Sequence, residues 1–103
     1  MTSIIELKDG VKLEYESTDT GVVITGVADD CPVNLAIPAE IAGRPVVEIG
    51  DSAFDGCSSL KAINIPTSVI TVGDSAFANC PRLKNQTLPA TVVNVGENVF
   101  DGD

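Results

Sequence analysis

Hydrophobic and polar residues alternate in short segments that return along the chain. In residues 60–66 (Leu-Lys-Ala-Ile-Asn-Ile-Pro), Ile63 and Ile65 alternate with small or polar positions, which predicts a strand with one buried face. Pro66 should end this strand, because proline has no N–H to donate to a sheet. A second, shorter apolar segment follows and contains Val69 and Val72.

This pattern repeats with a constant period. The pentapeptide Gly-Asp-Ser-Ala-Phe occupies residues 50–54 and again residues 73–77, and the related Gly-Glu-Asn-Val-Phe occupies residues 96–100, so each copy begins 23 positions after the one before. A fixed period of this length is typical of a solenoid, in which stacked units share one continuous core.

Each unit should also contain one short helical turn. Gly73 is expected to turn the chain, and Asp74 is suited to be the N-cap of a single helical turn over residues 75–80. Asp51 and Glu97 occupy the equivalent positions. The phenylalanines of these turns should form one buried column, made of Phe54, Phe77 and Phe100.

Residues 1–32 do not follow the repeat and predict an N-terminal β cap. An Asp-Gly turn signal at residues 9–10 precedes an alternating segment at 11–16, which predicts a β-hairpin, and residues 22–27 predict another strand. A solenoid needs such an atypical unit to cover its open apolar end. We expect residues 33–103 to hold the repeats and to form one structural domain with the cap.

The first repeat is longer than the others. The interval from Pro38 to Pro66 exceeds that from Pro66 to Pro89 by five positions, so the first unit contains an insertion. The insertion lies within residues 39–45, where a glycine and a proline indicate a turn. We therefore expect a loop to bulge from the first repeat.

The full repeat reads Leu60-x-x-Ile63-x-Ile65-Pro66-x-x-Val69-x-x-Val72-Gly73-x-x-Ala76-Phe77-x-x-Cys80. This pattern, over residues 33–103, resembles the BspA-like class of bacterial leucine-rich repeats. The resemblance implies a mainly β, right-handed solenoid with a parallel sheet built from the Ile-x-Ile-Pro strands. It also implies a binding or adhesion role without catalysis, commonly at bacterial surfaces.

The net charge of the chain argues against nucleic acid and anionic membranes as partners. The 103 residues include 6 Lys plus Arg and 15 Asp plus Glu, which gives a net charge of −9. A chain this acidic repels phosphate backbones and anionic lipid, so we expect no nucleic-acid partner. We also expect no membrane insertion, because no apolar run approaches the roughly 18 residues that a span requires, and the first residues lack the features of a signal peptide.

The residue types that catalysis needs are scarce. The chain has no His, the usual base for a Ser or Cys nucleophile, and it has no Gly-rich phosphate loop. Three cysteines without His make a zinc site improbable. We expect neither an enzyme nor a cofactor.

The cysteine count predicts a reduced chain. Cys57 and Cys80 should stack in one column, about 4.8 Å apart, whereas the Cβ atoms of a disulfide lie about 3.8 Å apart. We expect these two thiols and that of Cys31 to be reduced. Reduced cysteines are typical of a cytoplasmic protein, which is the location expected for the chain as written. If the chain is a fragment of a longer family member, we expect it at the cell surface or secreted.

Two surfaces are candidates for binding. The outer face of the expected sheet is either simply solvated or a weak partner-binding surface, and its residues are Asn34, Lys61, Asn64, Lys84, Asn85 and Thr87. A β-branched column either packs in the core at a bend or forms an exposed association stripe, and its residues are Val47, Ile70 and Val93.

Two functions follow from these features. The first is a non-catalytic protein-interaction module, a candidate part of a bacterial surface adhesin, whose partner is a protein or a surface ligand. The alternative is a self-associating structural unit that forms a homo-oligomer by stacking through its open C-terminal coil near Phe100.

Overall fold

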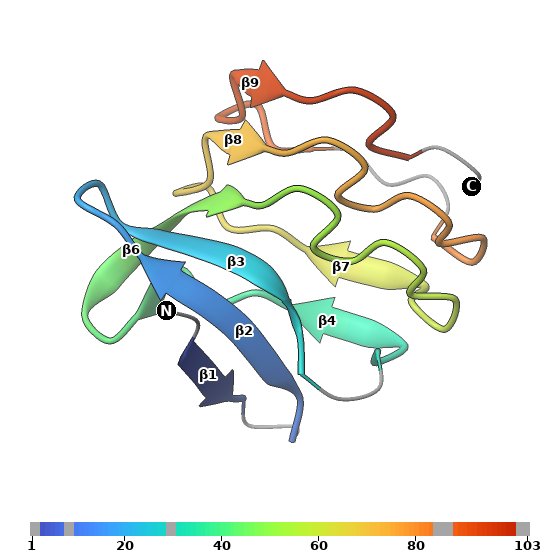
Figure 1. Cartoon of the computed structure of the whole chain (residues 1–103), viewed down its shortest axis with the longest axis horizontal. Helices are drawn as coiled ribbons and strands as arrows, with labels where there is room; N and C mark the ends of the chain where they lie inside the picture. Colours follow the sequence, from blue (N-terminus) through green and yellow to red (C-terminus); the bar gives the residue numbers. More distant parts are fainter. Residues whose placement is uncertain (1–2, 8–9, 29–30, 84–87, 101–103) are drawn as a thin grey trace.

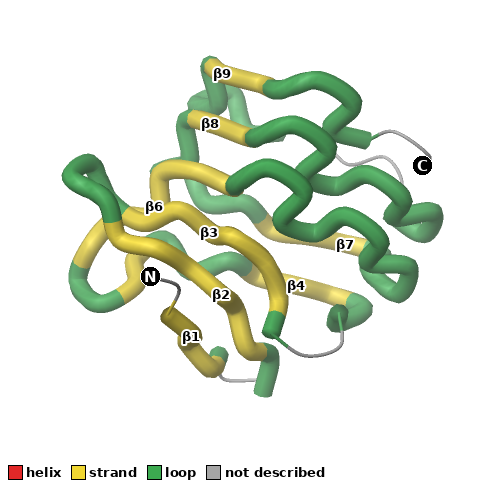
Figure 2. Tube along the Cα trace, viewed as in Figure 1, coloured by secondary structure: helices red, strands yellow, loops and turns green. Residues whose placement is uncertain are grey.

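A computed structural model describes residues 3–7, 10–28, 31–83 and 88–100. These residues form strands and turns and contain no helix, so the chain is mainly β as expected. The repeats are stacked as successive coils, one coil per repeat, with the N-terminal strands at one end of the stack and the last repeat at the other (Figures 1 and 2).

One parallel sheet is built from the Ile-x-Ile segments. Strand β4 (Asn34–Ala36) pairs in parallel with β7 (Ala62–Asn64), and Leu35 lies opposite Ile63. The inward side chains of this pair are buried, as the alternating pattern predicted. The third copy of the segment falls on residues 84–87, which lie outside the described residues.

The second apolar segments form another parallel sheet. Strands β6 (Arg44–Ile49), β8 (Thr71–Val72) and β9 (Asn94–Val95) pair in sequence, each residue opposite its equivalent in the next repeat. Both sheets therefore keep the register of the repeats, and each coil contacts its neighbour through main-chain hydrogen bonds.

The N-terminal strands extend the second sheet. Strands β1 (Ser3–Glu6) and β2 (Lys12–Ser17) form the predicted antiparallel hairpin, and β3 (Val22–Val27) is the further strand expected. β3 then pairs in parallel with β6, which gives the strand order β1-β2-β3-β6-β8-β9. Leu13 and Ile24 of this cap are fully buried in the core that the cap shares with the first repeat.

The extra residues of the first repeat form a small hairpin where a loop was expected. Strand β5 (Glu40–Ile41) pairs antiparallel with β6, and the two residues between them, Ala42 and Gly43, both have positive φ. Positive φ at both central residues is characteristic of a tight hairpin turn. The Arg44 guanidinium donates to the carbonyl of Thr18, which ties the insertion to the β2–β3 turn of the cap.

The helical turns expected over residues 75–80 and their equivalents are absent from the described residues. Ser52 and Ser75 have φ near +55°, a left-handed conformation that interrupts a helix. Alternate amides of these turns donate to the next coil, as in Phe54 N–H to the Ala76 carbonyl (2.8 Å) and Phe77 N–H to the Val99 carbonyl (2.9 Å). Others donate within the turn, as in Asp55 N–H to the Ser52 carbonyl (3.2 Å), so bonds between coils and local turn bonds together hold these segments.

The acidic residues expected to be N-caps also join neighbouring coils. Oδ1 of Asp51 accepts the N–H of Asp74, and Oδ1 of Asp74 accepts the N–H of Glu97, both at 2.8 Å. The coils approach so closely here that a Cβ on Gly73 would lie 2.6 Å from the Asp51 nitrogen. The acidic residue of each repeat therefore hydrogen-bonds to the next repeat, and the glycine before it allows the two coils to approach closely.

The predicted phenylalanine column is confirmed. The rings of Phe54 and Phe77 are stacked with centroids 5.5 Å apart, and those of Phe77 and Phe100 are 5.7 Å apart. Phe54 and Phe77 are fully buried, whereas Phe100, in the last coil, is half-buried. The column links successive repeats through the hydrophobic core.

Candidate interaction surfaces

The outer face of the β4–β7 sheet presents small polar side chains. Asn34 and Asn64 are exposed at diagonal corners of the strand pair, with Ala36 and Ala62 at the other two corners. Together with Leu35 and Ile63, these four residues line a shallow depression of about 390 Å³. Lys61 is exposed beside this face.

Half of the first candidate surface is thus brought together on one face. Its other members, Lys84, Asn85 and Thr87, lie outside the described residues. Within the described part of the chain, the side-chain amides of Asn34 and Asn64 have no hydrogen-bond partner. Amides have both donors and acceptors, so these two groups are available to a ligand.

The second candidate, the stripe of Val47, Ile70 and Val93, lies along the bend of consecutive coils. The amide of Ile70 donates to the Val47 carbonyl (2.9 Å), and the amide of Val93 donates to the Ile70 carbonyl (3.0 Å). Val47 is half-buried, but Ile70 is 47% exposed and Val93 is 74% exposed. Two of the three side chains therefore lie on the surface and not in the core.

The last coil exposes positions that are buried in the earlier ones. Ile49 and Val72 are fully buried in β6 and β8, whereas the equivalent Val95 of β9 is 55% exposed. Val69 is likewise buried, while its equivalent Val92 is half-buried. We call this surface, formed by Val92, Val93 and Val95, the open end.

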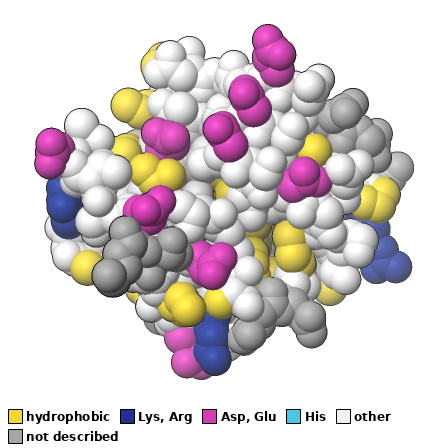
Figure 3. All heavy atoms as spheres, viewed as in Figure 1, with side chains coloured by type: hydrophobic (Ala, Val, Ile, Leu, Met, Phe, Trp, Pro, Cys, Tyr) yellow, Lys and Arg dark blue, Asp and Glu magenta, His cyan; other side chains and the backbone are white. Residues whose placement is uncertain are grey.

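Acidic side chains form a further surface that the sequence pattern did not reveal. Asp51, Asp74 and Glu97 are exposed in one column, where the two aspartates bridge consecutive coils. A hollow of about 440 Å³ lies beside them and includes Glu48 and Asn94 in its lining. Figure 3 shows acidic groups spread over this face of the molecule, with basic groups only near its periphery.

The described residues contain neither a group of metal ligands nor a helix able to cross a membrane. In residues 3–7, 10–28, 31–83 and 88–100, no three His, Cys, Asp or Glu side chains are grouped so as to hold a metal ion. A search of the same residues finds no helix with the length and apolar character to cross a bilayer.

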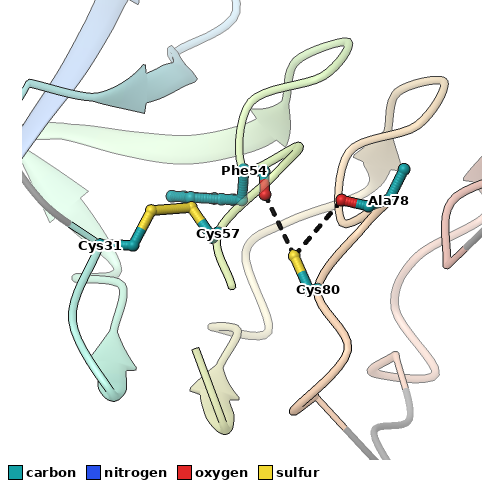
Figure 4. Close-up of a disulfide and its surroundings, with 5 residues drawn as sticks. All are labelled: Cys31, Phe54, Cys57, Ala78 and Cys80. Atoms are coloured by element: carbon teal, nitrogen blue, oxygen red, sulfur yellow. Dashed lines mark hydrogen bonds between the residues drawn. A yellow bond between two sulfur atoms is a disulfide. The ribbon is translucent and has the colours of Figure 1, made fainter. Parts of the chain in front are cut away.

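The expectation that all three cysteines are reduced is wrong. Cys31 and Cys57 form a disulfide, with Cα atoms 5.5 Å apart (Figure 4). The expectation rested on the stacking of Cys57 with Cys80, but Cys31 lies at the end of the cap and reaches Cys57 from outside that column. Cys80 does follow the prediction: it remains a thiol, is fully buried, and donates to the Phe54 carbonyl at 3.1 Å.

Comparison with known proteins identifies the repeat. The model of the family described as "BspA type Leucine rich repeat region (6 copies)" matches residues 34–103. No curated protein sequence matches the chain significantly.

Solved structures of bacterial leucine-rich repeat proteins have the same fold. A leucine rich cell surface protein from Faecalibacterium prausnitzii is 25% identical over 94% of this chain and 27% of its own length, with a TM-score of 0.72. A leucine-rich repeat protein from Bacteroides ovatus is 27% identical over 87% of this chain and 31% of its own, with a TM-score of 0.58.

The leucine-rich repeat protein of T. pallidum shares the fold at 23% identity and a TM-score of 0.64, with 84% of this chain covered. This chain spans about half of the T. pallidum protein (52%) and about a quarter of the F. prausnitzii protein (27%). The chain belongs to the BspA-type leucine-rich repeat family.

Proposed function

We propose that this chain is a non-catalytic protein-interaction module of a bacterial surface protein. Leucine-rich repeat domains generally mediate contacts between proteins, and the family is generally non-catalytic. The stacking of coils in register with the repeat supports the solenoid that the family implies, and its right-handed coil is part of this proposal. Such a solenoid offers a regular, rigid face on which side chains of successive coils stand in columns.

The observation that carries the proposal is the pair of amides without partners on the β4–β7 face. Asn34 and Asn64 flank a depression whose other lining residues are uncharged, so a partner can approach the sheet closely. Peptide groups and hydroxyls of a protein ligand supply the matching donors and acceptors. Lys61 adds a positive charge at the edge of this face, on a chain whose net charge is −9.

Two observations support a location outside the cytoplasm. Disulfides persist in oxidising compartments and are rare in the cytosol, and Cys31 is bonded to Cys57. The F. prausnitzii relative is described as a cell surface protein. An adhesin role is the most direct use of a binding module in that location.

The experiment is a binding survey followed by one substitution. The purified chain is immobilised and tested against collagen, laminin, mucin and intact epithelial cells. Ala62→Arg places a long charged side chain at the depression and should reduce binding at least tenfold, on the order of the loss of a central interface contact. Ala90→Arg is the control, because Ala90 is also exposed but lies in a turn of the last coil.

The control variant should bind as the original chain does. Equal binding by Ala62→Arg and the original chain would contradict the assignment to the β4–β7 face. If the chain bound none of the four probes, the adhesin role would be contradicted.

A further inference from the structure

Cysteines from three successive units of the chain come together at the core. Cys31 lies at the end of the cap, Cys57 belongs to the first repeat, and Cys80 occupies the equivalent position of the second repeat, 23 residues later. Cys57 is bonded to Cys31, whereas Cys80 remains a thiol. A disulfide and a thiol in the adjacent coil are the two reactants of thiol–disulfide exchange.

Hydrogen bonds place the Cys80 thiol against the coil that contains Cys57. The Phe54 carbonyl oxygen accepts the Cys57 N–H at 3.2 Å and the Cys80 thiol at 3.1 Å, so the two residues share one acceptor atom. Main-chain bonds hold the two coils together at the same place, since the Gly56 N–H donates to the Ala78 carbonyl at 2.9 Å. Figure 4 shows the Cys80 side chain directed from its own coil toward the Phe54 carbonyl.

The spacing of stacked coils allows a bond between these two cysteines, although it does not favour one at rest. Stacked positions lie about 4.8 Å apart, and disulfides join residues whose Cα atoms are roughly 4.4–6.8 Å apart. The Cβ atoms of Cys57 and Cys80 would have to approach by about 1 Å to reach the usual separation of about 3.8 Å. Cys80 is therefore a thiol in the resting fold and within range of Cys57 after a small shift of one turn.

We propose that Cys57 has two alternative disulfide partners, so that its bond moves from Cys31 to Cys80 by exchange. The Cys80 thiol loses its proton to solvent, and the thiolate attacks the Cys57 sulfur. The Cys57–Cys80 bond forms, the Cys31–Cys57 bond breaks, and the Cys31 sulfur leaves with the electron pair and takes up a proton. One disulfide and one thiol are present before and after the step, which consumes no oxidant or reductant. This inference is independent of the proposed binding role of the β4–β7 face.

The exchange changes which units of the chain are joined and which thiol is accessible. The present bond ties the cap to the first repeat, whereas the exchanged bond ties the first repeat to the second. The thiol moves from Cys80, which is fully buried, to Cys31, which is only half-buried. Accessible thiolates are the reactive form of cysteine, whereas buried structural thiols are inert. The released Cys31 thiol can therefore react with a disulfide of another molecule.

Trapping of the released thiol tests the proposal on the original chain. The folded, oxidised protein is incubated for hours with iodoacetamide at mildly alkaline pH, because uncatalysed disulfide rearrangement is slow. Mass spectrometry then maps the bonds after cleavage at Glu40, which separates Cys31 from Cys57, and at Lys61, which separates Cys57 from Cys80. Exchange predicts label on Cys31 together with a Cys57–Cys80 bond.

Three variants isolate the steps. Cys80→Ala has no attacking thiol and should lose the labelling of Cys31 entirely. Cys31→Ala leaves Cys57 and Cys80 as thiols, and oxidised glutathione should join them in a bond while it is reduced to its own thiol. Cys57→Ala leaves two thiols that the first repeat separates, and the same treatment should give no bond within the chain. Thermal unfolding verifies that each variant is folded.

Label on Cys31 with a Cys57–Cys80 bond in the original chain, lost in Cys80→Ala, would support the proposal. Label on Cys80 with the Cys31–Cys57 bond intact would overturn it, because the thiol would then react without exchange. A Cys31 that stays unlabelled would also overturn it, and two unbonded thiols in oxidised Cys31→Ala would exclude the bond on which it rests.

Discussion

Phe77 is the residue on which the stack depends most. Its ring is fully buried between the nearly parallel rings of Phe54 and Phe100, at 5.5 and 5.7 Å. Phe77→Ala should lower the free energy of unfolding by about 3–5 kcal/mol. The substitution removes a buried ring and leaves a cavity between the rings of Phe54 and Phe100, which the neighbouring coils can fill only in part. Urea and thermal denaturation measure this loss.

Phe100→Ala is the matched control for Phe77→Ala. Phe100 is half-buried in the last coil and has a stacking partner on one side only among the described residues. Its truncation should cost clearly less than that of Phe77. Equal losses at the two positions would mean that the rings do not form the column described.

At the scale of elements, the cap and the first repeat are joined covalently. The Cys31–Cys57 bond spans 26 positions of the sequence, and closing a loop of this size should stabilise the fold by about 3 kcal/mol. Reductant should therefore lower the melting temperature of the original chain. A Cys31→Ala, Cys57→Ala variant should melt at one temperature with or without reductant.

Thiol titration provides the independent check on this bond. Denatured but unreduced protein should show one reactive thiol, that of Cys80, which lies outside the disulfide and is buried in the native fold. Three reactive thiols in oxidised preparations would contradict the bond, and Cys80→Ala should leave none.

The elements could be predicted from sequence where the alternation was local. The strands around Ile63 and Tyr15 were found because period-two alternation reports one buried face. The predicted helical turns were wrong, although a segment such as residues 75–80 has the composition of one. The Ser75 and Phe77 amides of this segment donate to the next coil and not along a helix, and local propensity does not describe such bonds.

The candidate sites were also predicted where a local pattern determined them and missed where a contact between distant segments did. The exposure of Asn34 and Asn64 followed from their alternation with the buried Leu35 and Ile63. The disulfide was missed because the distance between Cys31 and Cys57 depends on how the cap meets the first coil, and this segment departs from the period. Repeat patterns predict contacts within the columns but not contacts between a repeat and an irregular cap.

At the scale of the whole molecule, one sheet runs from the cap to the last repeat. β3 extends the cap into β6, and β8 and β9 continue the sheet with one strand from each further repeat (Figure 1). Each coil is positioned by the coil that it packs against, so the columns of outward side chains depend on this stacking. A binding surface on the sheet therefore requires that the repeats stack in register.

Nuclear Overhauser effects between backbone protons test this register most directly. Stacking in register predicts cross-strand effects that link Ile49 with Val72 and Val72 with Val95, in the pattern of parallel strands. It also predicts slow exchange of the Gly73 and Gly96 amides, which donate to those strands. Effects within residues 75–80 that fit a helical turn, without contacts between equivalent positions of neighbouring repeats, would contradict it.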